Sequence, residues 1–127
     1  MDFQMVASLP ASDIDRARSW YQEKLGVQPS VYEDEGVLMY MNGDSAFMVY
    51  ASEFAGTNQA TAAGLVVEDF DAALMSLRSS GVVFEDYDFG DGMATVEGVM
   101  TDPTGRRTAW FKDSEGNILG LAENPMP

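Results

Sequence analysis

The stretch Phe111-Lys112-Asp113-Ser114-Glu115-Gly116-Asn117-Ile118-Leu119-Gly120-Leu121 decides the fold of this chain. A polar turn lies between two apolar arms, and it places Gly116 beside Asn117, two residue types that tolerate the positive φ of a tight reversal. The pattern predicts the last hairpin of a β-sheet, with Trp110 and Phe111 on its first arm. The elements before this hairpin can be placed by the same kinds of signal.

The chain presents the same order of elements twice. Asp13 and Asp69 are suited to cap the first turn of a helix, and each is followed two residues later by a second aspartate that the helix dipole favours. Gly26 and Gly81 are suited to end these helices. The expected strands are 3–9, 29–34, 37–41 and 45–51 in the first half, and 61–67, 82–87, 106–112 and 117–123 in the second.

This internal repeat predicts an α+β fold of two βαβββ modules, residues 1–56 and 57–127, in one compact unit. Asn42-Gly43 is the strongest hairpin signal of the first module. The second module carries an insertion over 88–105 that is rich in glycine and also apolar. A loop of this length indicates either a packed flap over a site or a cover for a sheet edge.

The composition narrows the chemistry. The 127 residues amount to one domain, and the net charge of −14 disfavours nucleic acid and anionic membranes as partners. The absence of cysteine excludes disulfides, and the absence of histidine removes the commonest metal ligand and general base. No apolar run is long enough for a membrane span, and residues 1–5 lack the basic and apolar pattern of a secretory signal, so we expect a cytoplasmic protein.

Two phrases, Leu9-Pro10-Ala11-Ser12-Asp13-Ile14-Asp15-Arg16-Ala17 and Lys112-Asp113-Ser114-Glu115-Gly116-Asn117, together with the repeat, closely resemble the glyoxalase/bleomycin-resistance/extradiol-dioxygenase superfamily, also called the vicinal oxygen chelate group. The resemblance implies that the two modules form a strongly curved mixed sheet around a cleft, with the helices outside. Many members are dimers whose cleft includes residues of both chains, so a homodimer is expected.

Metal-dependent members place their ligands on the first and fourth strands of each module. Counting from the motifs puts Val6, Phe47, Ala62 and Gly120 at these positions. None of these side chains offers the oxygen or nitrogen donor that a divalent ion needs. The resemblance therefore indicates the metal-free branch of the superfamily, and no metal, cofactor or catalytic residue is expected. The spacing of Asp86, Asp88, Asp91 and Glu97 is only weakly similar to a calcium loop, and Gly90 stands where a ligand would be needed.

Strand alternation predicts which side chains line the cleft. The expected ligand-binding residues are apolar or small, with a few polar groups for orientation, as is typical of ligand pockets. An ordinary hydrophobic core would use the same residue types, and that interpretation stays open for each of them. The predicted set is Gln4, Val6, Ser8, Phe47, Val49, Ala62, Met93, Trp110, Phe111 and Gly120.

Three functions are compatible with these features. The favoured one is a metal-independent small-molecule binding protein of the bleomycin-resistance type, which holds a ligand in an apolar cleft without converting it. The acidic surface would suit a cationic ligand, and the aromatic residues a planar one. The alternatives are a metal-dependent lyase, isomerase or dioxygenase with unrecognised ligands, and a dimeric interaction module with a filled core.

Overall fold

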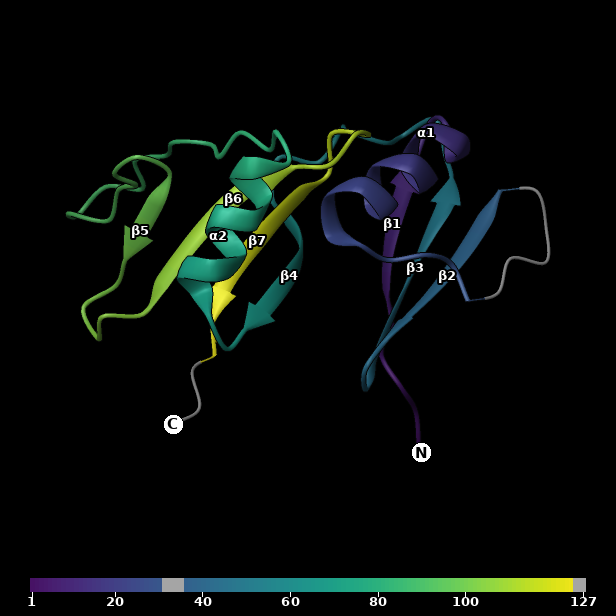
Figure 1. The fold of residues 1–127 in the computed structure, drawn as a ribbon, viewed down its shortest axis with the longest axis horizontal. Helices are drawn as coiled ribbons and strands as arrows, with labels where there is room; N and C mark the ends of the chain where they lie inside the picture. Colours follow the sequence, from purple (N-terminus) through teal and green to yellow (C-terminus); the bar gives the residue numbers. More distant parts are fainter. Residues whose placement is uncertain (31–35, 125–127) are drawn as a thin grey trace.

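The computed structural model describes residues 1–30 and 36–124, which form two modules side by side (Figure 1). The first module consists of β1 (Ala7–Ala11), α1 (Ile14–Trp20), the π-helical turn η1 (Tyr21–Leu25), β2 (Val37–Asn42) and β3 (Ser45–Ala51). The second consists of β4 (Thr61–Val67), α2 (Phe70–Ser79), β5 (Val99–Thr101), β6 (Arg107–Lys112) and β7 (Ile118–Glu123). No helix in the described ranges has the length and apolar character needed to cross a membrane.

Each module contributes one mixed sheet. The strand orders are β1-β3-β2 and β4-β7-β6-β5, and in both sheets the first strand pairs in parallel with the last strand of its module. Both helices cover the same side of the two sheets (Figure 1). The predicted α+β class, with mixed sheets and helices outside, is confirmed. The described strands form two separate sheets whose edge strands β1 and β4 face each other, rather than one continuous sheet.

The helix boundaries follow the predicted local chemistry. The Asp13 carboxylate accepts a hydrogen bond from the Arg16 N–H, and Asp69 accepts one from the Ala72 N–H in the second module. These contacts satisfy backbone donors that the first helical turn leaves unpaired. Gly26 ends the first helical segment with a left-handed φ of 68°, which a residue without a side chain adopts at little cost.

The hydrophobic core lies between each sheet and its helix. In the first module, Leu9, Val49 and Tyr40 are buried beneath Tyr21 and Ala17 of the helical segment. In the second module, residues at alternate positions of β6 and β7 belong to the core and pack under one apolar stripe of α2: Ala109, Phe111, Leu119 and Leu121 from the strands, and Phe70, Leu74 and Leu77 from the helix. None of the helices in the described part of the chain lies on the opposite side of either sheet, and we call that side the helix-free face (Figure 1).

The turn at residues 113–117, which we call the clasp, joins the two modules. The buried Asp113 accepts a hydrogen bond of 2.6 Å from the Tyr21 hydroxyl in the first module. Asn117 donates its side-chain amide to the Pro10 carbonyl, and the Glu115 side chain, with no exposed area, accepts hydrogen bonds from Arg16 at 2.8 and 3.0 Å. The polar turn read in the sequence as a hairpin tip thus fixes the first module against the second.

Several predicted strand limits are wrong. β1 begins at Ala7 rather than at residue 3. It also continues through Pro10 to Ala11, because β1 is an edge strand and the missing N–H of a proline is tolerated there. The segment 82–87 forms a single bridge, Phe84 to Phe111, rather than a strand, and the fourth strand of that sheet, β5, comes from the insertion. The strand expected over 29–34 falls mostly outside the described residues.

Candidate ligand-binding face

Strand pairing assigns the side chains to the two faces of each sheet. In β6 and β7, Phe111, Leu119 and Leu121 are in the core, so their neighbours Trp110 and Gly120 lie on the helix-free face. Trp110 and Gly120 are direct partners in the antiparallel ladder. The two residues that the sequence singled out on this hairpin therefore meet.

Gly120 makes room for the Trp110 indole. A Cβ atom added at Gly120 would lie 3.4 Å from Trp110 Nε1 and 3.7 Å from Thr61 Cγ2. The indole Nε1 donates a hydrogen bond of 3.1 Å to the Thr61 hydroxyl, which holds the ring in this orientation. An aromatic ring thus lies over Gly120, the position that the sequence analysis aligned with a metal ligand of the resembled family.

Two aromatic residues from the insertion and the segment before it extend this surface. The ring centroids of Tyr87 and Phe89 lie 5.8 and 5.3 Å from that of Trp110, both in edge-to-face geometry. Phe89 keeps 56% of its surface exposed, whereas Trp110 and Tyr87 are half-buried. The three rings form an open aromatic cluster, which we call the Trp110 cluster.

Two aspartates are chain neighbours of a residue of the Trp110 cluster. Asp86 and Asp88 flank Tyr87 in the chain, and both are exposed. Hydrogen bonds from the Thr95 hydroxyl and the Gly98 N–H lower the pKa of Asp86 below its ordinary value, so this group carries its charge at neutral pH. Burial raises the pKa of the Tyr87 hydroxyl, with a further contribution from Glu85. The segment that carries Tyr87 and Phe89 therefore also carries fixed negative charge.

The helix-free face of the first sheet is rich in methionine. Met48 lies between Met39 on β2 and Ser8 on β1 in the ladder, and Tyr50 lies between Val37 and Pro10. Thioether side chains adapt to many ligand shapes because they are unbranched and polarizable. The described strand residues on this face are uncharged and mostly apolar.

Three predicted site residues lie on the other side of the sheets. Val49 and Phe111 are buried in the core under the helices, at 1% and 0% exposure, and Phe47 stacks on Tyr40 with ring centroids 4.6 Å apart. The expectation that Phe47 and Val49 share a face with Val6 and Ser8 is wrong. The parallel register pairs Ala7 with Phe47 and Ser8 with Met48, so the count was one residue out and Met48 takes the place assigned to Phe47.

The remaining predicted residues are dispersed. Ser8 and Gly120 lie on the helix-free faces, and Ala62 lies at a register irregularity in β4 and packs against the core. Gln4 is exposed before the start of β1, as part of an arm in which Phe3 and Met5 are also exposed. Val6 directly precedes β1, and Met93 is half-buried in the insertion. Their roles in binding stay predictions.

The set of ligand-binding residues predicted from the sequence does not include Tyr87, Phe89 or Met48. Phe89 belongs to the insertion over 88–105, and Tyr87 ends the strand expected over 82–87. The strand register identifies Met48. Ser8 pairs with Met48 in the first sheet, and the equivalent pair in the second sheet is Gly64 with Gly120. Within residues 1–30 and 36–124, no group of three or more Asp and Glu side chains is placed to hold a metal ion.

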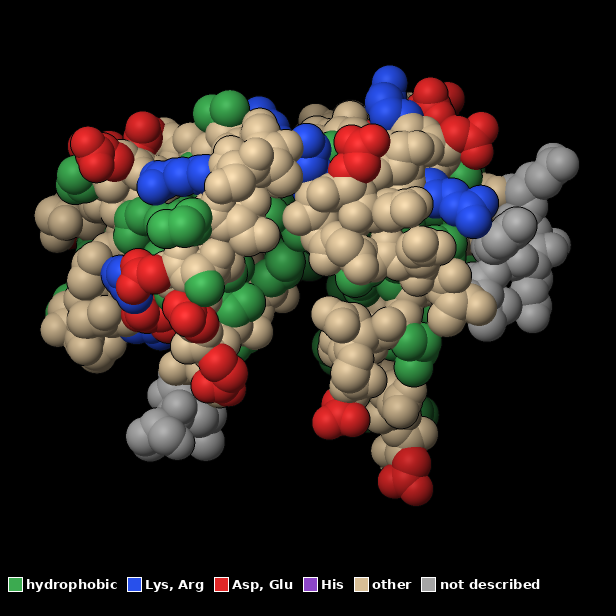
Figure 2. Space-filling model, viewed as in Figure 1, with side chains coloured by type: hydrophobic (Ala, Val, Ile, Leu, Met, Phe, Trp, Pro, Cys, Tyr) green, Lys and Arg blue, Asp and Glu red, His purple; other side chains and the backbone are tan. Residues whose placement is uncertain are grey.

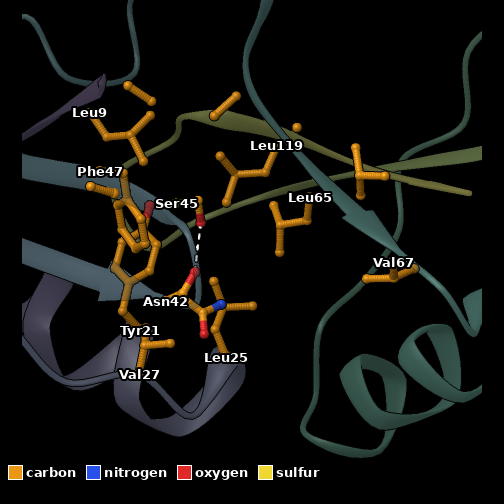
Figure 3. Close-up of a pocket in the computed structure, with 15 residues that line it drawn as sticks. Leu9, Tyr21, Leu25, Val27, Asn42, Ser45, Phe47, Leu65, Val67 and Leu119 are labelled. Carbon is orange, nitrogen blue, oxygen red and sulfur yellow. Dashed lines mark hydrogen bonds between the residues drawn. The ribbon is translucent and has the colours of Figure 1, made fainter. Parts of the chain in front are cut away.

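A separate pocket opens between the modules. Figure 2 shows a notch between their lower halves on the helix-covered side, and Figure 3 shows the side chains that line the pocket there. It has a volume of about 470 Å³ and is bounded by β1, β3 and η1 on one side and by β4 and β7 on the other. Phe47 is the one predicted site residue in its lining.

The sequence profile described as Glyoxalase/Bleomycin resistance protein/Dioxygenase superfamily matches residues 3–121. The chain belongs to this superfamily. Among curated protein sequences, no significant match to the chain was found.

Solved structures agree with the family. The chain is similar to a glyoxalase/bleomycin resistance protein from Catenulispora acidiphila, with 24% identity, a TM-score of 0.71, and coverage of 98% of this chain and 100% of the other. It is similar to a bleomycin-binding protein complexed with bleomycin (21%, 0.71, 97% and 99%) and to a lactoylglutathione lyase from Agrobacterium tumefaciens (14%, 0.72, 98% and 95%). At these identities the likeness shows the fold.

Proposed function

We propose that this chain is a metal-independent small-molecule binding protein of the glyoxalase/bleomycin-resistance type. Its ligand is a planar, cationic compound that stacks on the Trp110 cluster and reaches across the helix-free faces. The chain holds this ligand without converting it.

The observation that carries the proposal is the position of the Trp110 indole. The ring occupies the space above Gly120, is anchored by Thr61, and has Tyr87 and Phe89 edge-on beside it. Such a fixed, partly exposed set of rings can stack on a planar molecule at low entropic cost, because few side-chain torsions must be frozen.

Charge supports a cationic ligand. The net charge of −14 steers cations toward the surface, and the exposed Asp86 and Asp88 flank Tyr87 in the chain. A cation over an aromatic face is attracted by the ring quadrupole, and nearby carboxylates add to this attraction. The structurally similar bleomycin-binding protein was solved with bleomycin, which makes that compound the first ligand to test.

Metal independence rests on the residues that occupy the ligand positions. Counting from the motifs gives Val6, Ala62 and Gly120, and the register of β1 and β3 gives Met48 in place of Phe47. None of the four supplies a carboxylate or imidazole. A carboxylate at Gly120 would also meet the indole. We propose accordingly that no metal or cofactor is used and that no catalytic residue is present.

We further propose a cytoplasmic homodimer in which the helix-free faces of two copies enclose the ligand. Met41 and Phe89 keep 60% and 56% of their surfaces exposed, and both belong to the apolar surroundings of these faces. A second copy would remove this apolar surface from water, which favours association.

Isothermal titration of the purified protein with bleomycin and with a planar dye cation such as ethidium tests the proposal. We expect binding that weakens about tenfold or more in Trp110→Ala, because stacking on the indole is lost. The matched control is Phe54→Ala, which removes an aromatic side chain that is 68% exposed and lies outside the helix-free faces.

Two outcomes would contradict the proposal. Equal affinity of Trp110→Ala and the parent protein, with circular dichroism showing both folded, would remove the Trp110 cluster as the site. Stoichiometric iron, manganese, nickel or zinc in elemental analysis of the purified protein would favour a metal-dependent lyase, isomerase or dioxygenase instead.

A further inference from the structure

The pocket between the modules opens mainly on the helix-covered side, and of the described residues on the helix-free faces only Ala46, Gly64 and Val66 reach its lining. Leu9 and Phe47 on its first wall belong to the core side of their strands, and Tyr21 and Leu25 come from the helical segment that covers this side (Figure 3). The Trp110 cluster is not part of its lining. A ligand on the aromatic face would therefore leave this pocket available.

The walls of the pocket carry no charge among the described residues that line it. Most of the lining is aliphatic or aromatic, and Figure 3 shows Leu65 and Leu119 of the second module facing Leu25 and Phe47 of the first. Two of its polar side chains already have partners within the chain. The Tyr21 hydroxyl donates to Asp113, and the Ser45 hydroxyl donates to the Asn42 carbonyl.

Hydrogen-bonding capacity remains at two places. The side-chain amide of the exposed Asn42 lies at one side of the pocket (Figure 3). Residues 63–67 of β4 also line the pocket, and β4 is the edge strand of its sheet. The backbone N–H and C=O groups on the outer side of an edge strand are not used by the sheet ladder, so they can bind a polar group of a ligand.

We propose that this pocket is a second binding site, for an uncharged and mainly apolar small molecule that carries a hydroxyl or amide group. The volume of about 470 Å³ falls in the range of ordinary small-molecule pockets. A charged molecule would lose its hydration without gaining an opposite charge from the lining, which is costly. A carboxylate would in addition be repelled by the net charge of −14.

Fluorescence titration with N-phenylnaphthylamine, an uncharged apolar probe, tests the site. We expect a fluorescence increase on binding, with displacement by decanol and at least about tenfold weaker displacement by decanoate and by decyltrimethylammonium, because an unpaired charge must then be desolvated. Trp110→Ala is expected to bind the probe as the parent protein does, which separates this site from the aromatic face.

Two variants alter the pocket, and each has a control on α2. Leu65→Trp fills the space and Leu25→Glu adds a charge, and both are expected to weaken probe binding about tenfold or more. Met75→Trp and Met75→Glu make the same changes at a side chain that is 69% exposed, and they are expected to leave the affinity unchanged. Thermal unfolding of each variant verifies that it is folded.

The proposal is overturned if the probe does not bind, if decanoate displaces it as well as decanol does, or if both pocket variants retain the parent affinity. It is also overturned if the exposed arm of a second copy fills the pocket. In that case a Phe3→Ser, Met5→Ser double variant would be monomeric in light scattering and would bind the probe, whereas the parent protein would be dimeric and would not.

Discussion

Each module has a hairpin turn before its last strand, and the two turns differ in what surrounds them. Residues 42–45 of the first module are exposed, and a Cβ atom added at Gly43 would meet nothing within 4 Å. In the clasp, Asp113, Glu115 and Asn117 are 5–6% exposed and bind side chains and backbone of the first module. The same local turn chemistry therefore serves only to reverse the chain in one module and to join the two modules in the other.

The difference teaches that turn propensity and burial are separate properties of a sequence. Asn42-Gly43 and Gly116-Asn117 both signal a reversal, because both pairs tolerate positive φ. The clasp joins the modules only because its hydrogen-bond partners lie about a hundred residues away in the chain. Substitutions at matching positions of the two turns should separate these contributions.

The largest effect is expected for Asp113→Ala. Its carboxylate accepts hydrogen bonds from the Tyr21 hydroxyl, the backbone N–H groups of residues 115 and 117, and the Asn117 amide, and these donors would be left buried without partners. We expect a loss of about 4 kcal/mol in the free energy of unfolding by urea, against less than about 0.5 kcal/mol for Asp44→Ala in the exposed turn. Equal losses would contradict the distinction.

A smaller effect is expected for Gly116→Ala. Gly116 has a φ of 86°, and an added Cβ would lie 3.0 Å from the Gly56 Cα in the linker between the modules. Strain and contact with backbone add, so we expect a loss of about 3 kcal/mol, against about 1 kcal/mol for Gly43→Ala, where only the φ of 60° is strained. Chemical denaturation measures both, and a larger loss at Gly43 would show that the close approach to Gly56 does not matter.

The smallest of the three effects is expected for Glu115→Gln, about 2 kcal/mol at neutral pH. Burial alone would raise the pKa of Glu115, but hydrogen bonds from Arg16, Ser114 and the Asp13 N–H lower it from 4.5 to about 2. A lowered pKa means that the charged form stabilises the fold above the ordinary pKa, and that this contribution is lost as the pH falls from 4.5 to about 2.

The stability difference between Glu115→Gln and the parent protein should accordingly shrink below pH 4.5 and vanish near pH 2, as unfolding curves across this range would show. The control Asp44→Asn changes a carboxylate in the exposed turn and is expected to leave the acid profile of the parent unchanged. A difference that stays constant down to pH 2 would mean that the Glu115 charge does not stabilise the clasp.

Local signals in the sequence predicted the elements whose cause is local. The caps at Asp13 and Asp69, the end at Gly26 and the hairpin at Asn42-Gly43 all lie where the residue types placed them. The strand limits near residues 3 and 82 were wrong, because pairing partners decide where an extended segment becomes a strand. The local sequence of a segment does not specify which strand it pairs with.

The candidate site was predictable in part for the same reason. Trp110 and Gly120 were named from the sequence, yet their direct contact depends on the register of β6 and β7. The count across β3 was one residue out, so the sequence analysis selected Phe47 instead of Met48. Phe47 lies on the helix-covered side, whereas Met48 lies on the helix-free face. Tyr87 and Phe89 belong to a segment without regular periodicity, so no pattern could assign them to the cluster.

The long separation between the clasp and its partners has a consequence for synthesis on the ribosome. Ser12 and Glu115, which are hydrogen-bonded, stand 103 residues apart, so the amino-terminal module emerges long before the group that secures it. Docking of the two halves must wait for nearly the whole chain, and contacts of such long range form slowly. Until the modules dock, the edge strands β1 and β4 are both exposed to water. This partly synthesised intermediate is the form most prone to aggregation.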